Sequence, residues 1–215
     1  MDHTRHAALF NASDADISLV GCGGIGAATA LVLGKMGVGS LTLFDDDVVN
    51  DINLATQLHR LSDTENYKVD AVWAMMREFC DDTHIDGECC RVEAGTQFDT
   101  SIVISAVDSI SARKDIWEAV KGSVVHWYLD ARMASEELHV YTVDFETDTS
   151  WYEQMISNES DENVVDEPCT SKATIYCSFL SAAIIGKTIK QIVSGVQPPR
   201  VFIQNLRNDA LTVIP

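Results

Sequence analysis

A glycine-rich turn between an apolar strand and an alanine-rich helix constrains the fold of this chain more than any other feature. Residues 17–20 read as a short buried strand, and the hexapeptide GCGGIG at residues 21–26 follows it directly. Residues 25–36 are rich in Ala and Leu and predict a buried helix that stops at Gly37. A second apolar strand is predicted at residues 40–44. Strand, glycine turn, helix and strand within about 30 residues predict a right-handed βαβ unit in a parallel sheet.

The turn has the spacing G-x-G-x-x-G, which lets a backbone approach a phosphate group closely. Its glycines are Gly21, Gly23, Gly24 and Gly26. The helix that follows offers free N–H groups and the positive end of its dipole, so the pattern predicts nucleotide binding. Asp45 ends the second strand, where an acid hydrogen-bonds the hydroxyl groups of a ribose. These features alone suit an NAD-dependent oxidoreductase, which we keep as an alternative.

Other polar residues favour a nucleoside triphosphate over a dinucleotide. They are Asp47, Asn53, Lys68 and Asp108. Lys68 could reach a triphosphate, and Asp108 follows an apolar strand at residues 101–106, where its carboxylate could bind Mg²⁺. A site for NAD needs neither group. The sequence therefore favours ATP with Mg²⁺ over NAD.

Helices and strands alternate along the rest of the chain. Helices are predicted at residues 64–80, 110–121 and 173–193, and strands at 84–93, 101–106, 124–129, 138–145, 201–204 and 211–214. Between them, residues 146–168 are strongly acidic and are predicted to form a long loop with at most a short turn at residues 151–156. We expect one α/β domain over residues 1–215, with a Rossmann-like doubly wound mixed sheet and a C-terminal antiparallel hairpin.

The charge and the cysteines exclude several classes of function. With 15 Lys and Arg against 33 Asp and Glu, the net charge is −18, which argues against nucleic acid and against an anionic membrane as partners. No apolar run reaches the roughly 18 residues of a membrane span, and the first residues lack the pattern of a secretory signal. Six cysteines without C-x-x-C spacing predict no structural zinc and reduced thiols, so we expect a cytoplasmic location.

These residues together resemble the ThiF/MoeB adenylyltransferases of the ubiquitin-activating-enzyme-like family. The similarity covers about residues 17–195 and is densest in 17–70. The matching positions are the glycine turn, Asp45 and Asp47, Asn53, Gln57, Lys68, and the run Ser105-Ala106-Val107-Asp108 followed by Arg113. The combination of the doubled glycine, the D-x-D pair and the asparagine is specific to this family.

The resemblance implies a reaction and its site residues. ATP and Mg²⁺ would bind at the carboxyl edge of the sheet, and a small ubiquitin-like or sulfur-carrier protein with a C-terminal glycine would be adenylated, with release of pyrophosphate. Asp45 would hold the ribose, Asn53 and Lys68 the phosphates, and Asp108 the Mg²⁺. Asp47 and Gln57 would belong to the nucleotide pocket. A homodimer is implied as well.

The chain departs from the family pattern at one catalytic position. Thr56 stands where the family usually has an arginine. Arg60 of the same chain, or Arg5 supplied by a partner subunit, could provide the missing cation. If neither does, the chain is a catalytically silent binding protein, which is the second alternative. Cys169 is either a nucleophile that forms a thioester with the carrier or a small residue at the entry of the last helix.

Two further features keep alternative interpretations. Arg132 could bind the carrier tail or a phosphate, or form an ion pair with Asp130. The acidic stretch at residues 146–168 could be a lid that excludes water from the adenylate, or a solvated loop.

Overall fold

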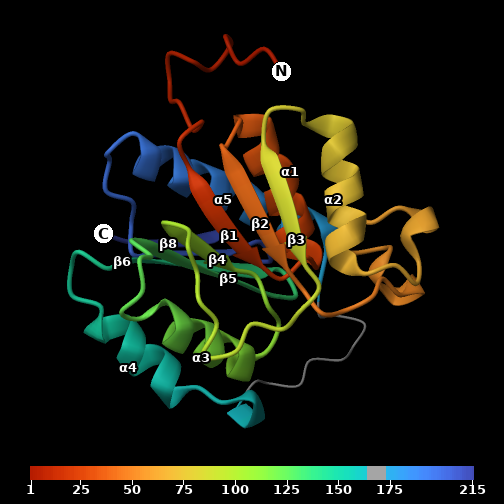
Figure 1. The fold of residues 1–215 in the computed structure, drawn as a ribbon. Coiled ribbons are helices and arrows are strands. Elements are labelled where there is room, and N and C mark those ends of the chain that lie inside the picture. The colour runs from red at the N-terminus through yellow and green to blue at the C-terminus, as the bar shows by residue number, and fades with distance from the viewer. Residues whose placement is uncertain (164–172) are drawn as a thin grey trace.

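The computed structural model describes residues 1–163 and 173–215, and a single mixed sheet of eight strands runs through it (Figure 1). The strands are β1 (Asp16–Val20), β2 (Ser40–Phe44), β3 (His84–Glu88), β4 (Ile102–Ser105), β5 (Trp127–Ala134), β6 (Glu137–Asp144), β7 (Val201–Asn205) and β8 (Ala210–Ile214). Their order is β3-β2-β1-β4-β5-β6-β7-β8. The first five are parallel, and the last three follow as antiparallel neighbours. This confirms the predicted doubly wound mixed sheet and its terminal hairpin.

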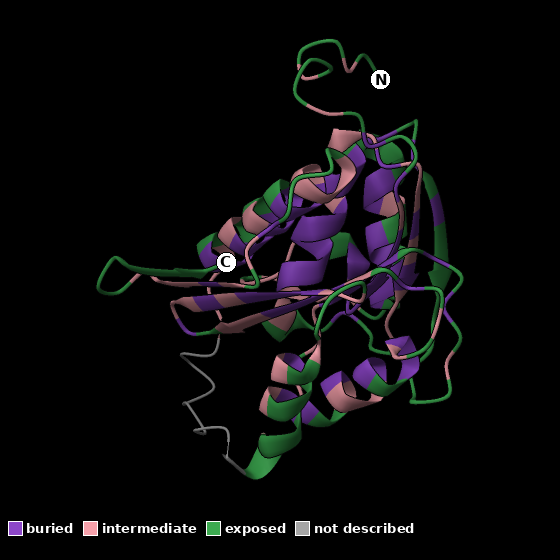
Figure 2. Ribbon diagram, turned by 90° about the vertical axis from the view of Figure 1, so that its left-hand side faces the viewer, coloured by how far each residue is buried: buried purple, intermediate pink, exposed green. Residues whose placement is uncertain are grey.

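Helices cover both faces of the sheet, as Figure 1 shows. They are α1 (Gly24–Met36), α2 (Lys68–Phe79), α3 (Ile110–Val120), α4 (Ser150–Asn158) and α5 (Ile175–Val193), with short 3₁₀ turns η1 (Asp51–Asn53), η2 (Leu61–Asp63) and η3 (Asp161–Asn163). Helix α1 packs against α2 and α5, whereas α3 packs against α4 on the other face. Each face therefore has its own apolar core, one around Leu33 and Ile185 and the other around Trp117. Purple buried segments line both sides of the sheet in Figure 2.

The first βαβ unit forms for the reasons visible in its sequence. Leu19 and Val20 of β1 are both buried, one in each core, as expected of a central parallel strand with helices on both faces. Helix α1 ends at Gly37, whose φ of 76° is left-handed and favours glycine. The chain then turns back into β2, which pairs in parallel with β1.

Helix α2 begins later than the sequence predicts. The expected start at residue 64 is wrong, because Glu65 has a positive φ of 70° and Tyr67 forms an antiparallel bridge with Val48. The helix can start only after that bridge, at Lys68. This late start puts Lys68 at the helix N-terminus, next to the turn that follows β2.

The prediction of a long loop at residues 146–168 is also wrong over the part that the structure describes. Residues Ser150–Asn158 form α4, and η3 follows at Asp161–Asn163. Tyr152 and Ile156, one helical turn apart, are buried against the face that carries α3. The helix forms despite the acidic composition, because burial of these two large side chains stabilises it and its charged side chains remain solvated.

Among the residues described, no helix combines the length and the apolar character needed to cross a bilayer.

Candidate functional site

The glycine turn lies at the point where the strand order of the sheet reverses. Its first amide, the Gly21 N–H, donates to the Phe44 carbonyl at the end of β2, at 2.8 Å. On its other side the turn packs on the chain that leaves β4, since a Cβ on Gly21 would lie 2.6 Å from the Ala106 carbonyl oxygen. Gly21 also has a φ of 98°, in the region that favours glycine. The turn therefore sits between the carboxyl ends of β2 and β4, where doubly wound sheets bind ligands.

Replacement by alanine is expected to destabilise the protein at Gly26 but not at Gly23, although both glycines belong to the turn. In Gly26→Ala the new Cβ would overlap the Gly21 carbonyl oxygen, whereas in Gly23→Ala the nearest atom, Gln57 Nε2, lies 3.7 Å away. We expect Gly26→Ala to lower the free energy of unfolding by about 1–3 kcal/mol through overpacking, and Gly23→Ala to change it little. Urea denaturation of the two variants measures the difference. An equal loss of unfolding free energy in the two variants would contradict the close approach of the Gly21 carbonyl oxygen to Gly26.

Asp45 holds the glycine turn in place. Its Oδ2 accepts from the Cys22 N–H at 2.6 Å, and its Oδ1 accepts from the Asp47 N–H at 2.8 Å. Burial raises the pKa of Asp45, while these two hydrogen bonds and Lys68 oppose the rise. The carboxylate thus stands half-buried beside the turn, at the position of a ribose-binding acid.

Lys68 presents its ammonium group to the same edge of the sheet. Its Nζ donates to Asp47 Oδ2 at 2.7 Å, and its backbone N–H donates to the Asp47 carbonyl at 2.9 Å. The Lys68 side chain is 10% exposed, whereas that of Asp47 is 67% exposed. An anion entering from solvent can therefore displace the exposed carboxylate and meet a lysine held in position by its buried stem.

Two side chains beside the turn have polar atoms without partners in the described chain. Gln57 lies over Gly23, and its buried Oε1 accepts no hydrogen bond. His59 is 9% exposed, and neither ring nitrogen is paired. Burial lowers the pKa of His59, and Lys68 lowers it further, so the ring is neutral at pH 7. Unpaired buried polar atoms are rare in folded proteins, and these suit a polar ligand such as a nucleotide.

Sequence reasoning missed His59. The motif gave no signal for it, because a single histidine in a polar stretch has no pattern of its own. Its proximity to Lys68 and to the Cys22 backbone comes from the fold of the loop between η1 and α2.

Asn53 lies at the start of the loop between η1 and α2 and holds that end in place. The Asn53 side chain accepts from the Asn50 N–H at 2.9 Å and so caps η1. This local bond fixes the loop that carries Thr56 and Gln57. The Thr56 carbonyl lies next to α1, 3.3 Å from the place where a Cβ on Gly24 would stand.

Asp108 lies in the exposed turn between β4 and α3 and makes no hydrogen bond or ion pair to other described residues. The side chains of Asp45, Asp46 and Asp47 come within 4.8 Å of one another, and their oxygens are the ligand type that Mg²⁺ prefers. The carboxyl edge of the sheet therefore offers carboxylates on both sides of the glycine turn.

The two arginines predicted as replacement cations lie elsewhere in this chain. The Arg60 guanidinium pairs with Asp63 at 3.1 Å and with Glu78 on α2. Arg5 belongs to an N-terminal segment whose amino group pairs with Asp81 at 2.6 Å, just after α2. The ends of α1 and α2 lie at the amino edge of the sheet (Figure 1), so Arg5 is remote from the glycine turn of its own chain.

A buried charge network stands beside Asp108. Asp130 is fully buried and accepts from Arg113, from Arg132 Nε at 2.8 Å and from the Tyr152 hydroxyl at 2.8 Å. Burial raises the pKa of Asp130, but the two arginines more than offset this and hold it below its ordinary value. Arg113 also donates to the Val107 carbonyl, so the network fixes the turn that carries Asp108.

Arg132 thus forms the ion pair with Asp130, and its remaining amino group binds the acidic segment just after α4. Arg132 Nη1 donates to Glu159 at 2.7 Å, and the guanidinium lies 4.9 Å from the centre of the Tyr141 ring. Two residues on, Asp161 accepts from the Ile110 N–H at 2.6 Å and so caps α3. The part of the acidic segment that follows α4 is therefore docked on the carboxyl edge next to Asp108, whereas the segment begins at the amino edge, where Asp144 pairs with Trp127.

The cysteines divide by exposure. Cys169 falls at residues 164–172, outside the described residues. Cys22 and Cys177 are fully buried, and burial raises the pKa of Cys177 to about 11, which makes it a poor nucleophile. Cys89 and Cys90 are exposed just after β3.

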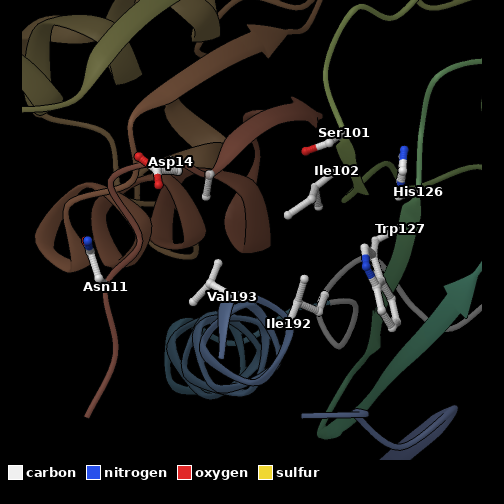
Figure 3. Close-up of a pocket in the computed structure, with 9 residues that line it drawn as sticks. Asn11, Asp14, Ser101, Ile102, His126, Trp127, Ile192 and Val193 are labelled. Carbon is white, nitrogen blue, oxygen red and sulfur yellow. The ribbon is translucent and has the colours of Figure 1, made fainter. Parts of the chain in front are cut away.

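A cavity of 310 Å³ lies at the opposite edge of the sheet (Figure 3). It is lined by the starts of β4 and β5 and by the end of α5, including Ile102, Trp127 and Val193. It is separate from the glycine turn and contains none of the predicted site residues.

Comparison with known proteins matches the chain to one family model, described as the ThiF family, over residues 3–213. Residues of this chain are 43% identical over 65 positions to "Adenylyltransferase and sulfurtransferase uba4" of Neosartorya fischeri, which is 30% of this chain and 14% of the relative. They are 29% identical over 127 positions to "Ubiquitin-like modifier-activating enzyme 5" of Bombyx mori, which is 52% of this chain and 32% of that relative. The chain therefore spans less than a third of these relatives' lengths.

Solved structures share the fold. E. coli MccB with ATP superimposes with a TM-score of 0.71 at 13% identity, covering 94% of this chain and 64% of MccB. PaaA superimposes with a TM-score of 0.72 at 17% identity, again covering 94% of this chain and 64% of the other.

Proposed function

The chain belongs to the ThiF family, and we propose that it is an ATP-dependent adenylyltransferase that activates the C-terminal carboxylate of a small ubiquitin-like or sulfur-carrier protein. The observation that carries this proposal is the set of groups around the glycine turn. A half-buried Asp45, a positioned Lys68 and the unpaired Gln57 Oε1 converge there. These groups match the ribose, the phosphates and the remaining polar atoms of ATP.

The reaction requires the carboxylate and ATP to be positioned, and it does not require a general base. A carboxylate is ionised at pH 7, so it can attack the α-phosphorus of ATP without losing a proton. The new bond joins the carboxylate oxygen to the α-phosphorus, and the bond to the β-phosphate oxygen breaks to release pyrophosphate. The protein must align the reactants and neutralise the phosphate charge.

Each predicted residue has a role in that scheme. Asp45 binds the ribose, and the N–H groups of the glycine turn and of α1 face the phosphates. Asn53 and Lys68 complete the phosphate contacts, and Gln57 belongs to the nucleotide pocket. Asp108 would hold Mg²⁺, whose charge would neutralise the triphosphate, and Asp47 would belong to the nucleotide pocket.

Because Thr56 replaces the arginine that is usual in the family, the proposed activity depends on a cation from elsewhere and so on the oligomeric state. Arg113 and Arg132 are already paired with Asp130, and Arg60 is paired with Asp63 and Glu78. Arg5 can therefore serve only as a residue donated by a partner subunit, which requires a homodimer. A chain without such a partner would bind ATP and the carrier without efficient turnover. A further proposed step is attack of the Cys169 thiol on the acyl adenylate, which forms a thioester with the carrier and releases AMP.

The nucleotide itself is tested first. We expect Mg²⁺-ATP to raise the melting temperature, and NAD⁺ and NADH to leave it unchanged. A ligand at about 100 times its Kd stabilises a protein by about 2.7 kcal/mol, which is roughly 5–10 °C for a chain of this length. A shift with NAD⁺ or NADH alone would support the oxidoreductase instead.

Adenylation is tested with ATP labelled at the α-phosphate. Ubiquitin-like and sulfur-carrier proteins that end in glycine are the substrates, and the same proteins with an amidated C-terminus are the matched controls. Label transfer to the free carboxylate alone supports the proposal. ATP binding without transfer to any of them would identify a silent binding protein.

A further inference from the structure

The cavity at the amino edge of the sheet has the size and the apolar floor of a small-molecule site. Its volume is 310 Å³, at the lower end of the range for ligand sites in proteins. Ile102 is 3% exposed at its floor, and Trp127, Ile192 and Val193 are partly buried against the same core. These side chains come from β4, β5 and α5 and line the cavity from different sides (Figure 3). The cavity therefore offers apolar surface to a ligand rather than to another part of the described chain.

Polar side chains form the rim of the cavity. They are Asn11, Asp14, Ser101 and His126 (Figure 3). Asp14 is exposed, and among the described residues its carboxylate accepts one hydrogen bond, from the Ser13 hydroxyl to Oδ1 at 3.3 Å. A carboxylate can accept several hydrogen bonds, so Asp14 has capacity left for a donor on a ligand.

The backbone that carries Asp14 is held in place on both sides. Before it, the Ser13 N–H donates to Asn11 Oδ1 at 3.0 Å. After it, the Ala15 carbonyl accepts from the Gly39 N–H at 3.0 Å, which ties the segment to the turn before β2. Because this backbone is already ordered, a ligand that contacts Asp14 loses little affinity to the ordering of the protein.

The charges around the cavity favour a cation. Among the described residues that line it, none is lysine or arginine. Helix α5 ends at Val193, so the negative end of its dipole lies beside the cavity. The ring of His126 lies 3.9 Å from Glu146, which adds a second carboxylate near the rim. The net charge of −18 also draws cations toward the chain at long range.

We propose that this cavity binds a small amphipathic amine, with its ammonium group on Asp14 and its apolar body on Trp127 and Val193. The ammonium group donates a charge-assisted hydrogen bond to the carboxylate, which is stronger than a bond between neutral groups. The apolar body leaves water and covers the floor of the cavity. An anion would be repelled by Asp14, and a purely apolar molecule would leave the carboxylate unused.

This site goes beyond the proposed function, because its ligand is not a reactant of adenylation. Ile102 and Trp127 begin β4 and β5, whereas the glycine turn and Asp108 lie at the carboxyl ends of the strands. The four residues of β4 span about 13 Å between these two edges. Binding of an amine can therefore be measured without ATP or a carrier protein.

Binding is measured by titrating the ¹⁵N-labelled protein with 2-phenylethylamine, which is protonated at pH 7 and carries a phenyl ring. The chain has four tryptophans, and the indole N–H signal of Trp127 is identified by its loss in Trp127→Phe. This signal should shift to saturation with a Kd of about 0.1–1 mM, as expected of a ligand with nine non-hydrogen atoms. The other three indole signals should stay in place. A Trp127 signal that is unmoved at about 10 mM amine would overturn the proposal.

Two aspartate variants separate this site from general attraction to an acidic surface. Asp14→Asn should raise the Kd for the amine about fivefold or more, because it removes the counter-charge of the ammonium group. Asp99→Asn makes the same charge change at another exposed aspartate, in the loop before β4, and should leave the Kd unchanged. Equal weakening in the two variants would overturn the role of Asp14.

A neutral ligand and a filled cavity complete the test. The alcohol 2-phenylethanol has the shape of the amine without its charge and should bind about fivefold more weakly or less; equal affinity would overturn the preference for a cation. Val193→Phe fills the cavity and should abolish the shift of the Trp127 signal, and its circular dichroism melt shows that it folds. A shift that persists in folded Val193→Phe would place the amine elsewhere and overturn the site.

Discussion

Replacing Lys68 by alanine is expected to lower the rate of carrier adenylation by about 100-fold and the affinity for Mg²⁺-ATP by about tenfold. The Lys68 ammonium lies close enough to Cys22 and Asp45 to oppose the rise that burial causes in their pKa values, and its partner Asp47 is 67% exposed, where a phosphate can replace it. Removing one preorganised charge-stabilising group from an active site costs about 10²–10³ in rate. Rates come from transfer of the α-labelled phosphate, and affinity comes from titration calorimetry.

Two variants control this result. Lys35→Ala removes a lysine whose Nζ is bound to the Phe79 carbonyl at the end of α2, and it should leave both quantities unchanged. Lys68→Arg keeps the charge and should retain part of the ATP affinity. If Lys68→Ala binds Mg²⁺-ATP as tightly as the wild type, the lysine does not contact the phosphates and the nucleotide lies elsewhere.

Replacing Asp130 by alanine is expected to lower the free energy of unfolding by about 3–5 kcal/mol. Arg113 is 4% exposed and would lose its counter-charge inside the protein, and removal of one partner of a buried ion pair has a cost of this size. The Tyr152 hydroxyl would also lose its acceptor. For a chain of this length the melting temperature should fall by roughly 6–20 °C.

The matched control is Asp14→Ala, since Asp14 is exposed and bonds only its neighbour Ser13 among the described residues. Removing both charges of the Asp130–Arg113 pair gives a second check on the cost of an unpaired buried charge. The double variant Asp130→Leu/Arg113→Met removes both charges and should be more stable than Asp130→Ala, because no unpaired charge stays buried. A loss below 1 kcal/mol in Asp130→Ala would show that water or a side-chain shift compensates Arg113.

The site could be predicted wherever its residues are close in sequence. The glycine turn, Asp45 and Lys68 follow one another around a single βαβ unit, and strand and helix periodicity place them at one edge of a sheet. Gln57 was predicted by resemblance, and the structure adds that its Oε1 is buried and unpaired. Roles in binding ATP or Mg²⁺ remain predictions for all of these residues.

The acidic segment shows where composition misleads. Eight of the 23 residues at 146–168 are acidic and none is basic, so a solvated loop is the natural prediction. Tyr152 and Ile156 nevertheless recur at helical spacing, and both are buried in α4. These two buried side chains, with the partly buried Trp151 and Met155 beside them, decide the structure of this helix.

The sequence by itself determined the parallel half of the sheet, the glycine turn at its switch point and the terminal hairpin, because each depends on residues within one or two neighbouring elements. Only the tertiary structure placed Arg5 at the far edge, joined Arg113 to Asp130, and brought Asp161 to the start of α3, 51 residues away. Periodicity records which side of one element is buried. It carries no information about which distant carboxylate meets which arginine, since that depends on the order in which strands lie side by side.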